Sequence, residues 1–296
     1  FKEKIDIGII ETGLGGRLDS TNVITPKISV ITKIDYDHIG ILGNSIESIT
    51  KEKCGVIKKQ IPVVIQNQTN KIKTIIKEEC LKKKSKLIDS SKIYPIENIQ
   101  SKNLYTSFDI NDLKITIPFL GQHQLLNAQT AIATILEYDK SIENKKIVKG
   151  LHSTKWPGRF QELSNNPKVF YDVGHNENSI KNTIKTIKDK FPNKTINGII
   201  TIKKTKKLTE IIKIIDKNFD QLILLFPPNE NDFYSQNYLK KMFYATKLKI
   251  STAKSIKKFF NNLKNDSNTL WLIFGSHYIA EQVFTYFNFP FEKGKI

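Results

Sequence analysis

Polar residues that could bind a cation or a phosphate directly follow several apolar runs of this sequence. Such runs are typical of buried strands, and ligands of parallel α/β sheets gather beyond the carboxyl ends of the strands. A carboxylate there is costly to bury alone, so it should meet a cation, a metal or a set of hydrogen-bond donors. The residues are Glu11 after Ile5–Ile10, Asp37 and His38 after Ile28–Ile34, Asp172, His175 and Asn176 after Val169–Tyr171, and Ser276 after Thr269–Phe274.

A glycine cluster follows the first of these carboxylates. Gly13, Gly15 and Gly16 lie between Glu11 and Arg17. Two interpretations are open: a strand-to-helix turn whose glycines only provide positive φ angles, or a loop that presents Glu11 to a cation.

The basic composition invites a nucleic-acid interpretation, which the residue types do not favour. The net charge is +18, but only Arg17 and Arg159 among the 47 basic residues are arginines. Phosphate and base recognition usually recruits the bidentate fork of arginine, and the lysine clusters at 82–84 and 203–207 lack interleaved aromatic residues. We therefore predict no nucleic-acid partner, and we expect the two arginines to do something that lysine cannot.

Length and composition favour a protein of about two domains. The 296 residues, 39% of them hydrophobic, can bury a sizeable core. No apolar run approaches the ~20 residues that span a bilayer, so no membrane partner is predicted. Cys54 and Cys80 match neither a zinc pattern nor a disulfide framework, which favours the cytoplasm. Because the chain opens at Phe1 and a strand is expected almost at once, we expect the first part of a longer protein to be absent.

The first half of the chain predicts alternating strands and helices. Asn44 with Glu47 has the spacing of a capping box, and Asn111 with Asp112 marks a hairpin turn. The predicted elements are strands over 5–10, 28–34 and 61–65, a helix from Asn44 to about Lys58, a helix with Ile72, Ile75, Ile76, Cys80 and Leu81 on one face, a hairpin over 105–119, a helix over 121–138 and a short helix to about Leu151.

The second half predicts another α/β series after a joint at Pro157-Gly158. Alternating strands and helices imply a parallel sheet with right-handed crossovers. The predicted strands cover 169–171, 196–202, 221–226 and 269–274. We therefore expect an α/β protein with domains at 1–152 and 153–296.

Seven segments occur in the order and approximate spacing of folylpolyglutamate synthase/dihydrofolate synthase, a family of the Mur ligase superfamily. The resemblance covers almost the whole chain. It implies a P-loop-type nucleotide-binding α/β domain, incomplete here, followed by a smaller Rossmann-like domain, with the active site in the cleft between them. The segments are Glu11–Val23, Asp37–His38, Glu52–Lys58, Gly121–Ala128, Trp156–Gln161, Asp172–Asn176 and Gly275–Ser276.

The resemblance implies ATP-dependent ligation of L-glutamate to a folate or dihydropteroate carboxylate through an acyl phosphate, with ATP and Mg²⁺ as cofactors and a monomeric protein. Such chemistry depends on cations that oppose phosphate charge and on exact placement of two substrates. By resemblance, Lys53 would be carbamylated and would support the metal site, and His175 and Ser276 would help to hold glutamate. The implied residues are Lys53, Asp172 and His175 for catalysis, Asn127, Arg159, Asp172 and Ser276 for the nucleotide, and Glu11 and His38 for the metal.

The sequence also departs from the family pattern. The phosphate-binding motif GxxxxGK[ST] does not occur in it, and the family's usual Asp-Gly-Ala-His-Asn-Pro is changed at Val173, Gly174 and Glu177. A lysine-rich turn at 203–207 replaces the usual acidic one. We therefore expect this chain alone to bind ATP weakly and not to ligate. Two alternatives stay open: another Mur-type ligase that accepts a nucleotide-sugar substrate, and a non-catalytic remnant of the family.

Overall fold

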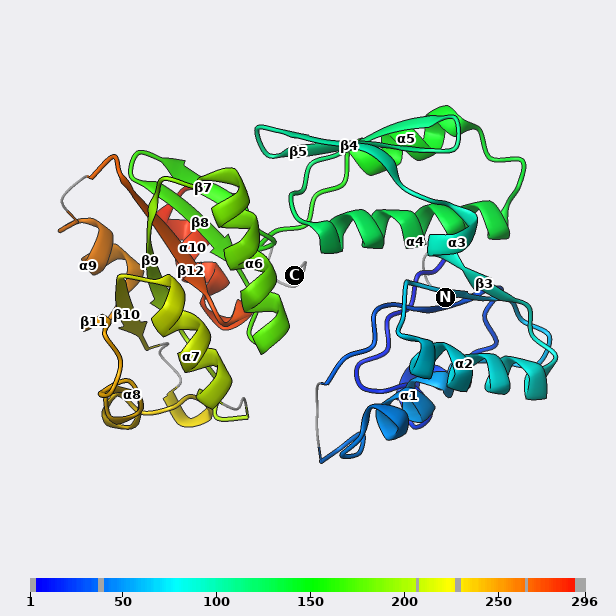
Figure 1. Cartoon of the computed structure of the whole chain (residues 1–296), viewed down its shortest axis with the longest axis horizontal. Helices are drawn as coiled ribbons and strands as arrows, with labels where there is room; N and C mark the ends of the chain where they lie inside the picture. Colours follow the sequence, from blue (N-terminus) through cyan, green and yellow to red (C-terminus); the bar gives the residue numbers. More distant parts are fainter. Residues whose placement is uncertain (1–3, 37–39, 206–207, 227–229, 264–265, 291–296) are drawn as a thin grey trace. The chain divides into compact units, whose positions relative to one another are not determined.

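The computed structural model describes residues 4–36, 40–205, 208–226, 230–263 and 266–290. The chain divides into two compact units, which we call unit 1 (residues 1–118 and 122–154) and unit 2 (residues 119–121 and 155–296). Figure 1 labels the helices and strands of both units.

Unit 1 contains a short parallel sheet with helices on both faces. Strands β1 (Ser29–Ile31), β2 (Val63–Ile65) and β3 (Leu87–Asp89) pair in the order β1-β2-β3. Ile31 and Ile65 pack with apolar residues of α1 (Ile46–Cys54) and α2 (Asn70–Lys83). On the other face, Val64 and Ile88 pack against Ala133 of α4 (Gln122–Tyr138). Because helices pack on both faces of the sheet, its strands carry apolar residues on both faces.

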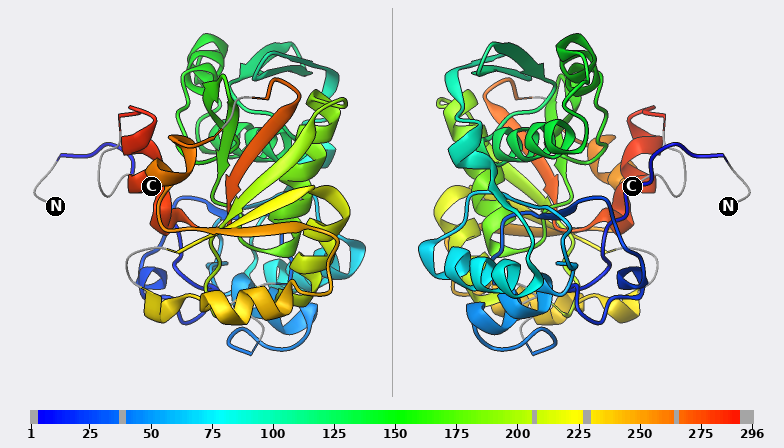
Figure 2. Two further views of the ribbon diagram at one scale, coloured as in Figure 1. Left: turned by 90° about the vertical axis from the view of Figure 1, so that its left-hand side faces the viewer. Right: turned by 90° about the vertical axis from the view of Figure 1, so that its right-hand side faces the viewer.

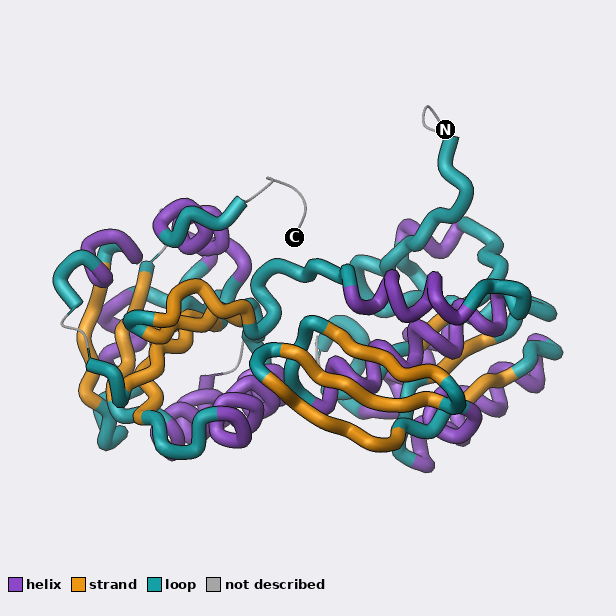
Figure 3. Tube along the Cα trace, turned by 90° about the horizontal axis from the view of Figure 1, so that it is seen from above, coloured by secondary structure: helices purple, strands orange, loops and turns teal. Residues whose placement is uncertain are grey.

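A second sheet of unit 1 is antiparallel. Its strands β4, β5 and β6 lie side by side (Figure 3). Asn111 has φ 48° in the turn between β5 and β6, so the predicted hairpin is confirmed. The remaining elements of unit 1 are η1 (Ser20–Val23), α3 (Ser90–Ile93), β4 (Glu97–Lys102), β5 (Tyr105–Ile110), β6 (Leu113–Ile117) and α5 (Asn144–His152).

Unit 2 is built on a six-stranded twisted sheet (Figure 2) with the order β11-β10-β9-β12-β8-β7. All neighbouring strands are parallel except β7 and β8. The sheet is covered on both faces, which makes its central strands continuously apolar. The strands are β7 (Gln161–Asn165), β8 (Lys168–Asp172), β9 (Thr195–Ile200), β10 (Gln221–Leu225), β11 (Lys249–Ala253) and β12 (Thr269–Phe274).

Alternate residues of these strands face different helices. Tyr171 and Ile273 belong to a cluster that includes residues of α9 and α10, whereas Phe170 packs on Phe191 at the end of α6 and Phe274 stacks on Phe219 just after α7. The α/β class predicted from the sequence is therefore confirmed. The helices of unit 2 are α6 (Glu177–Lys190), α7 (Leu208–Asn218), η2 (Glu230–Asp232), α8 (Gln236–Met242), α9 (Ile256–Phe260), η3 (His277–Ile279) and α10 (Ala280–Tyr286).

The strand predicted over residues 5–10 is wrong. Residues 4–10 form no strand with any described part of the chain, and the side chain of Ile9 is 96% exposed. An apolar run becomes a strand only where a neighbour supplies backbone hydrogen bonds and apolar cover. Among the described strands, β1 is the edge of the sheet and pairs only with β2.

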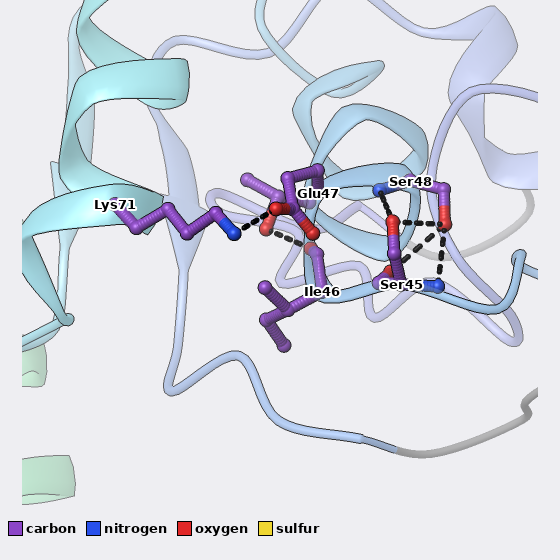
Figure 4. Close-up of polar contacts among 6 residues, drawn as sticks. Ser45, Ile46, Glu47, Ser48 and Lys71 are labelled. Carbon is purple, nitrogen blue, oxygen red and sulfur yellow. Dashed lines mark hydrogen bonds and ion pairs between the residues drawn. The ribbon is translucent and has the colours of Figure 1, made fainter.

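The predicted capping box of α1 is displaced by one residue. Ser45 is the N-cap, and its hydroxyl accepts from the Ser48 N–H while the Ser48 hydroxyl accepts from the Ser45 N–H. Glu47 instead forms an ion pair with Lys71 of α2 (Figure 4). Ser45 is the N-cap in place of Asn44 because the helix begins at Ile46, so that the Ser45 side chain reaches the N–H of Ser48, the third residue of the helix.

Two further points concern the helices. Leu81 is 67% exposed, so the prediction that it shares the buried face of α2 is wrong. None of the helices in the described part of the chain combines the length and the apolarity that crossing a bilayer requires.

Candidate functional site

The glycine cluster of unit 1 docks against the C-terminal end of α1. A Cβ atom on Gly55 would lie 2.2 Å from Cα of Arg17, and one on Gly16 would lie 2.9 Å from the carbonyl oxygen of Lys53. Gly15 has φ 71°, as the turn interpretation requires. Close approach of two backbones is therefore a second reason for glycine here, besides positive φ.

Arg17 ties this loop to α1. Its backbone N–H donates to the Glu52 carbonyl oxygen over 2.8 Å, and its side-chain Nε donates to Glu52 Oε1 over 3.0 Å. The Nη2 atom lies 2.9 Å from the same carboxylate oxygen. The planar guanidinium makes this two-nitrogen contact, which lysine could not reproduce.

Asp19 closes the loop from within, and the sequence analysis did not single it out. Its Oδ1 accepts from the Thr21 hydroxyl (2.6 Å) and the Thr21 N–H (3.0 Å), and its Oδ2 accepts from the Leu14 N–H (2.8 Å). These bonds, first that of the Thr21 hydroxyl, lower the pKa of Asp19 to about 2. The available signal was an Asp followed by Ser and Thr, which is typical of a helix N-cap.

The predicted metal ligands are placed only in part. Glu11 is exposed, Lys53 is half-buried on α1, and His38 lies outside the described residues. No group of three or more His, Cys, Asp or Glu that could hold a metal occurs among the residues that the structure describes. The carboxylate of Glu11 still suits Mg²⁺, which is often held by one or two carboxylates together with substrate phosphates and water. The metal assignments stay predictions.

Asn127 on α4 lies in a chain of side-chain amides. Gln66 Nε2 donates to Asn127 Oδ1 over 3.0 Å, and Asn127 Nδ2 donates to Gln124 Oε1 over 3.1 Å. Gln66 was missed by the sequence analysis although it directly follows the apolar run 61–65. It carries the same signal that singled out Glu11.

The carboxyl ends of β8 and β12 bring predicted residues of unit 2 together. Asp172 pairs in register with Phe274, so Ser276 follows β12 at the edge where Asp172 ends β8. Asp172 is 7% exposed; its Oδ2 accepts from the Phe160 N–H (2.9 Å) and its Oδ1 accepts from the Gly174 N–H (2.7 Å). Both oxygens of this carboxylate are thus held by backbone donors.

Neighbouring side chains complete this edge. The Nδ1 atom of His175 lies 3.3 Å from the Val173 carbonyl oxygen. Ser276 is buried, and its hydroxyl accepts from the Tyr278 N–H over 3.1 Å. The Tyr171 hydroxyl donates to the Ser276 carbonyl oxygen over 2.8 Å, and burial raises the pKa of Tyr171.

Two cations, Arg159 and Lys203, lie near the same edge, and Lys203 also forms an ion pair of 3.7 Å with Asp232. The Arg159 guanidinium lies 4.8 Å from the centre of the Trp156 ring, and the Lys203 ammonium lies 3.8 Å from that of Tyr278. Partial burial lowers the pKa of His277, and the cations Lys203 and Arg159 lower it further. An anionic group would therefore be favoured here.

The structure thus brings four predicted residues to one sheet edge within unit 2, and it places Glu11, Lys53 and Asn127 in unit 1. The four are Arg159, Asp172, His175 and Ser276.

Comparison with known protein families finds two matches. The Mur ligase middle domain matches residues 1–135, and the glutamate ligase domain of Mur ligases matches residues 158–277. Dihydrofolate synthase/folylpolyglutamate synthase of Bacillus subtilis is 30% identical over 294 residues, which cover 95% of this chain and 67% of that protein. Folylpolyglutamate synthase of Lacticaseibacillus casei is 31% identical over 213 residues, which cover 68% of this chain and 50% of that protein.

Solved structures show the same fold. Mycobacterium tuberculosis folylpolyglutamate synthase, complexed with ADP and AMPPCP, aligns with a TM-score of 0.88 at 21% identity, over 98% of this chain and 70% of that one. The apo form of the L. casei enzyme aligns with a TM-score of 0.78 at 25% identity, over 95% of this chain and 66% of that one. The chain spans between half and two thirds of the length of the two relatives named above. It belongs to the dihydrofolate synthase/folylpolyglutamate synthase family of Mur ligases.

Proposed function

We propose that this chain carries the nucleotide-binding and glutamate-binding parts of a ligase that uses ATP and Mg²⁺ to join L-glutamate to a folate or dihydropteroate carboxylate. The observation that supports this most is the sheet edge of unit 2, where Asp172 ends β8, Ser276 follows the paired strand β12, and Arg159 precedes Phe160, whose N–H donates to Asp172. Membership of the ligase family supports the same reaction.

In this proposal the cation-rich edge of unit 2 binds the phosphates and ribose. The Cζ atom of Arg159 lies over the Trp156 ring, 4.8 Å from its centre, and the planar fork of N–H donors of an arginine suits phosphate oxygens. The two carboxylate oxygens of Asp172 accept the N–H groups of Phe160 and Gly174, which fixes the carboxylate at this edge, and a carboxylate is an acceptor that suits a ribose hydroxyl.

His175 and Ser276 would orient the glutamate whose amine attacks the acyl phosphate, and Asn127 would contact the adenine. Glu11 and His38 would hold the Mg²⁺, which offsets phosphate charge when bound. A carbamylated Lys53 would present a carboxylate in place of an ammonium and so support that metal site. Positioning and charge stabilisation account for such catalysis without a nucleophilic side chain.

The domain boundaries and the setting of the protein belong to this proposal as well. We propose a nucleotide-binding domain at 1–152, a glutamate-ligase domain at 153–296, and a cytoplasmic monomer with small-molecule substrates and with neither nucleic acid nor membrane as a partner. Cys54 and Cys80 are free and buried, which supports a reducing compartment.

ADP release tests the proposal. The assay supplies Mg-ATP, L-glutamate and either dihydropteroate or tetrahydrofolate to the chain and, where its gene encodes more than these 296 residues, to the longer product. We expect release from the longest product to require one of the two pterins. Arg159→Lys should raise the KM for ATP roughly tenfold, because lysine keeps the charge but loses the fork. Lys155→Met, which removes an exposed charge from the same segment, should leave that KM unchanged.

Two outcomes would contradict the proposal. Release that requires a nucleotide-sugar acceptor would favour a cell-wall Mur ligase. No release with any acceptor from the longest product, together with no Mg-ATP binding by that product in calorimetry, would favour a non-catalytic remnant.

A further inference from the structure

Two buried glutamines that follow β2 hold the segment that follows β1. Gln66 Oε1 accepts from the Lys33 N–H over 3.1 Å. Gln68 Oε1 accepts from the Ile34 N–H over 3.1 Å, and its Nε2 donates to the Thr32 carbonyl oxygen over 2.8 Å. The side chains of Gln66 and Gln68, 3% and 5% exposed, thus replace the ladder that would have continued β1 to the predicted residue 34.

The Lys33 N–H also determines the direction of the amide chain to α4. A backbone N–H can only donate, so the Gln66 oxygen must face it, and the Gln66 nitrogen must face Asn127. Asn127 consequently accepts from Gln66 through Oδ1 and donates to Gln124 through Nδ2. One backbone donor therefore fixes the orientation of three side-chain amides.

Asn127 keeps hydrogen-bonding capacity after these contacts. An amide with one bond at each end retains a second N–H and a second lone pair. Adenine matches this pair with its 6-amino donor and a ring-nitrogen acceptor. Hypoxanthine has an oxygen at the 6 position, which would face the Asn127 lone pair, unless the amide could turn over.

We propose that Gln66 is a positioning residue that prevents this turn and thereby makes Asn127 select adenine over 6-oxo purines. The proposal rests on the nucleotide contact of Asn127 in the proposed function. Gln66 itself acts through Asn127 and needs no contact with the base.

Two substitutions distinguish the role of the Gln66 oxygen, which accepts from Lys33, from that of the Gln66 nitrogen, which donates to Asn127. Gln66→Met removes both bonds and leaves the Asn127 amide able to turn. Gln66→Glu, at about pH 8, where an ordinary glutamate is ionised, keeps an acceptor for Lys33 but presents a second acceptor to Asn127, which should turn the amide over. Gln129→Met is the matched control. Like Gln66, Gln129 is a buried glutamine; it lies on α4, and its side chain donates to the Tyr94 carbonyl oxygen.

The readouts are the ratio of the Kd for Mg-ITP to the Kd for Mg-ATP, and the hydrogen exchange of the Lys33 amide. We expect the ratio to fall roughly three- to tenfold in Gln66→Met and further in Gln66→Glu, and to stay unchanged in Gln129→Met. Lys33 exchange should accelerate at least about tenfold in Gln66→Met and keep its wild-type rate in Gln66→Glu. The Kd ratio should thus change more in Gln66→Glu, whereas Lys33 exchange should change more in Gln66→Met. A purely structural role of Gln66 would rank the two variants in the same order by both readouts.

Equal nucleotide ratios in the wild type and both Gln66 variants, with ATP preferred in each, would overturn the inference. Unchanged Lys33 exchange in Gln66→Met would also overturn it. A wild-type chain that does not prefer ATP to ITP would instead contradict the adenine contact of the proposed function, and the exchange pattern would still decide whether Gln66 orients Asn127.

Discussion

Gly55→Ala should destabilise unit 1 although its backbone would accept alanine. Gly55 has φ −58°, a helical value open to any residue. Its missing side chain matters because an added Cβ would lie 2.2 Å from Cα, 2.5 Å from Cβ and 2.5 Å from N of Arg17. Carbon atoms pack at about 3.5–4.0 Å, so the loop backbone would have to move by more than a flexible side chain could absorb.

The contacts of Arg17 set the size of the effect. Moving its backbone disturbs the bond from the Arg17 N–H to the Glu52 carbonyl oxygen and the bond from Asn22 Nδ2 to the Arg17 carbonyl oxygen, of 2.8 and 3.1 Å. Each contributes about 0.5–1.5 kcal/mol, and overpacking itself costs about 1–3 kcal/mol. We expect the free energy of unfolding of unit 1 to fall by about 3 kcal/mol.

The matched control is Gly150→Ala in α5, because a Cβ at Gly150 would meet nothing within 4 Å. Alanine there should stabilise the helix by about 0.5–1 kcal/mol. Trp156 and Trp271 both lie in unit 2, so their fluorescence in urea follows unit 2, while hydrogen exchange of α2 amides follows unit 1. If Gly55→Ala leaves the α2 opening free energy within about 0.5 kcal/mol of wild type, the steric argument is refuted.

Two further predictions concern pKa values of unit 1. Cys54 and Cys80 should not react with a thiol reagent at neutral pH without denaturant, since burial raises their pKa values to about 12 and about 11; rapid labelling of the folded chain would contradict this. Asp19 should titrate near pH 2 in carbon NMR, chiefly because the Thr21 hydroxyl donates to it. Since its folded pKa lies below the ordinary 3.8, its stabilising effect is present above pH 3.8 and is lost as the pH falls toward 2. The difference in unfolding free energy between the wild type and Asp19→Asn should therefore become smaller as the pH falls from 3.8 toward 2. A difference that stays constant over this range would contradict the lowered pKa of Asp19.

Strands with apolar runs were predictable, and strands without them were not. The predicted strand 269–274 is β12 itself, because both of its faces are buried. Strand β4 was missed because every one of its residues is exposed, so that it lacks the alternation from which a strand is predicted. Strand β11, at the edge of its sheet, was missed because it has no fully buried residue and only Ile250 and Ala253 are partly buried. Such strands form because a neighbour supplies a hydrogen-bonding ladder, which is a tertiary property.

The run Ile5–Ile10 shows the opposite limit. Its composition favours a strand as strongly as that of residues 61–65, which contain β2. The difference is that β2 has β1 on one side and β3 on the other, whereas residues 4–10 pair with no described strand. The apolar composition of a segment shows that it could be buried as a strand. Whether it is buried depends on whether neighbouring strands pair with it.

The candidate site divides in the same way. Polar residues at strand ends, such as Asp172 and Ser276, could be placed at one edge from sequence because the carboxyl ends of parallel strands share a side of the sheet. The role of Gln66 could not, because its contact with Lys33 depends on the register between β1 and β2, and its contact with Asn127 depends on how α4 covers that sheet. A sequence can therefore supply the atoms of an amide for which we propose adenine recognition, but the direction in which the amide points follows from a backbone donor 94 residues earlier (127 − 33 = 94). Substitutions at Gln66 should accordingly change which base is preferred before they change whether the chain folds.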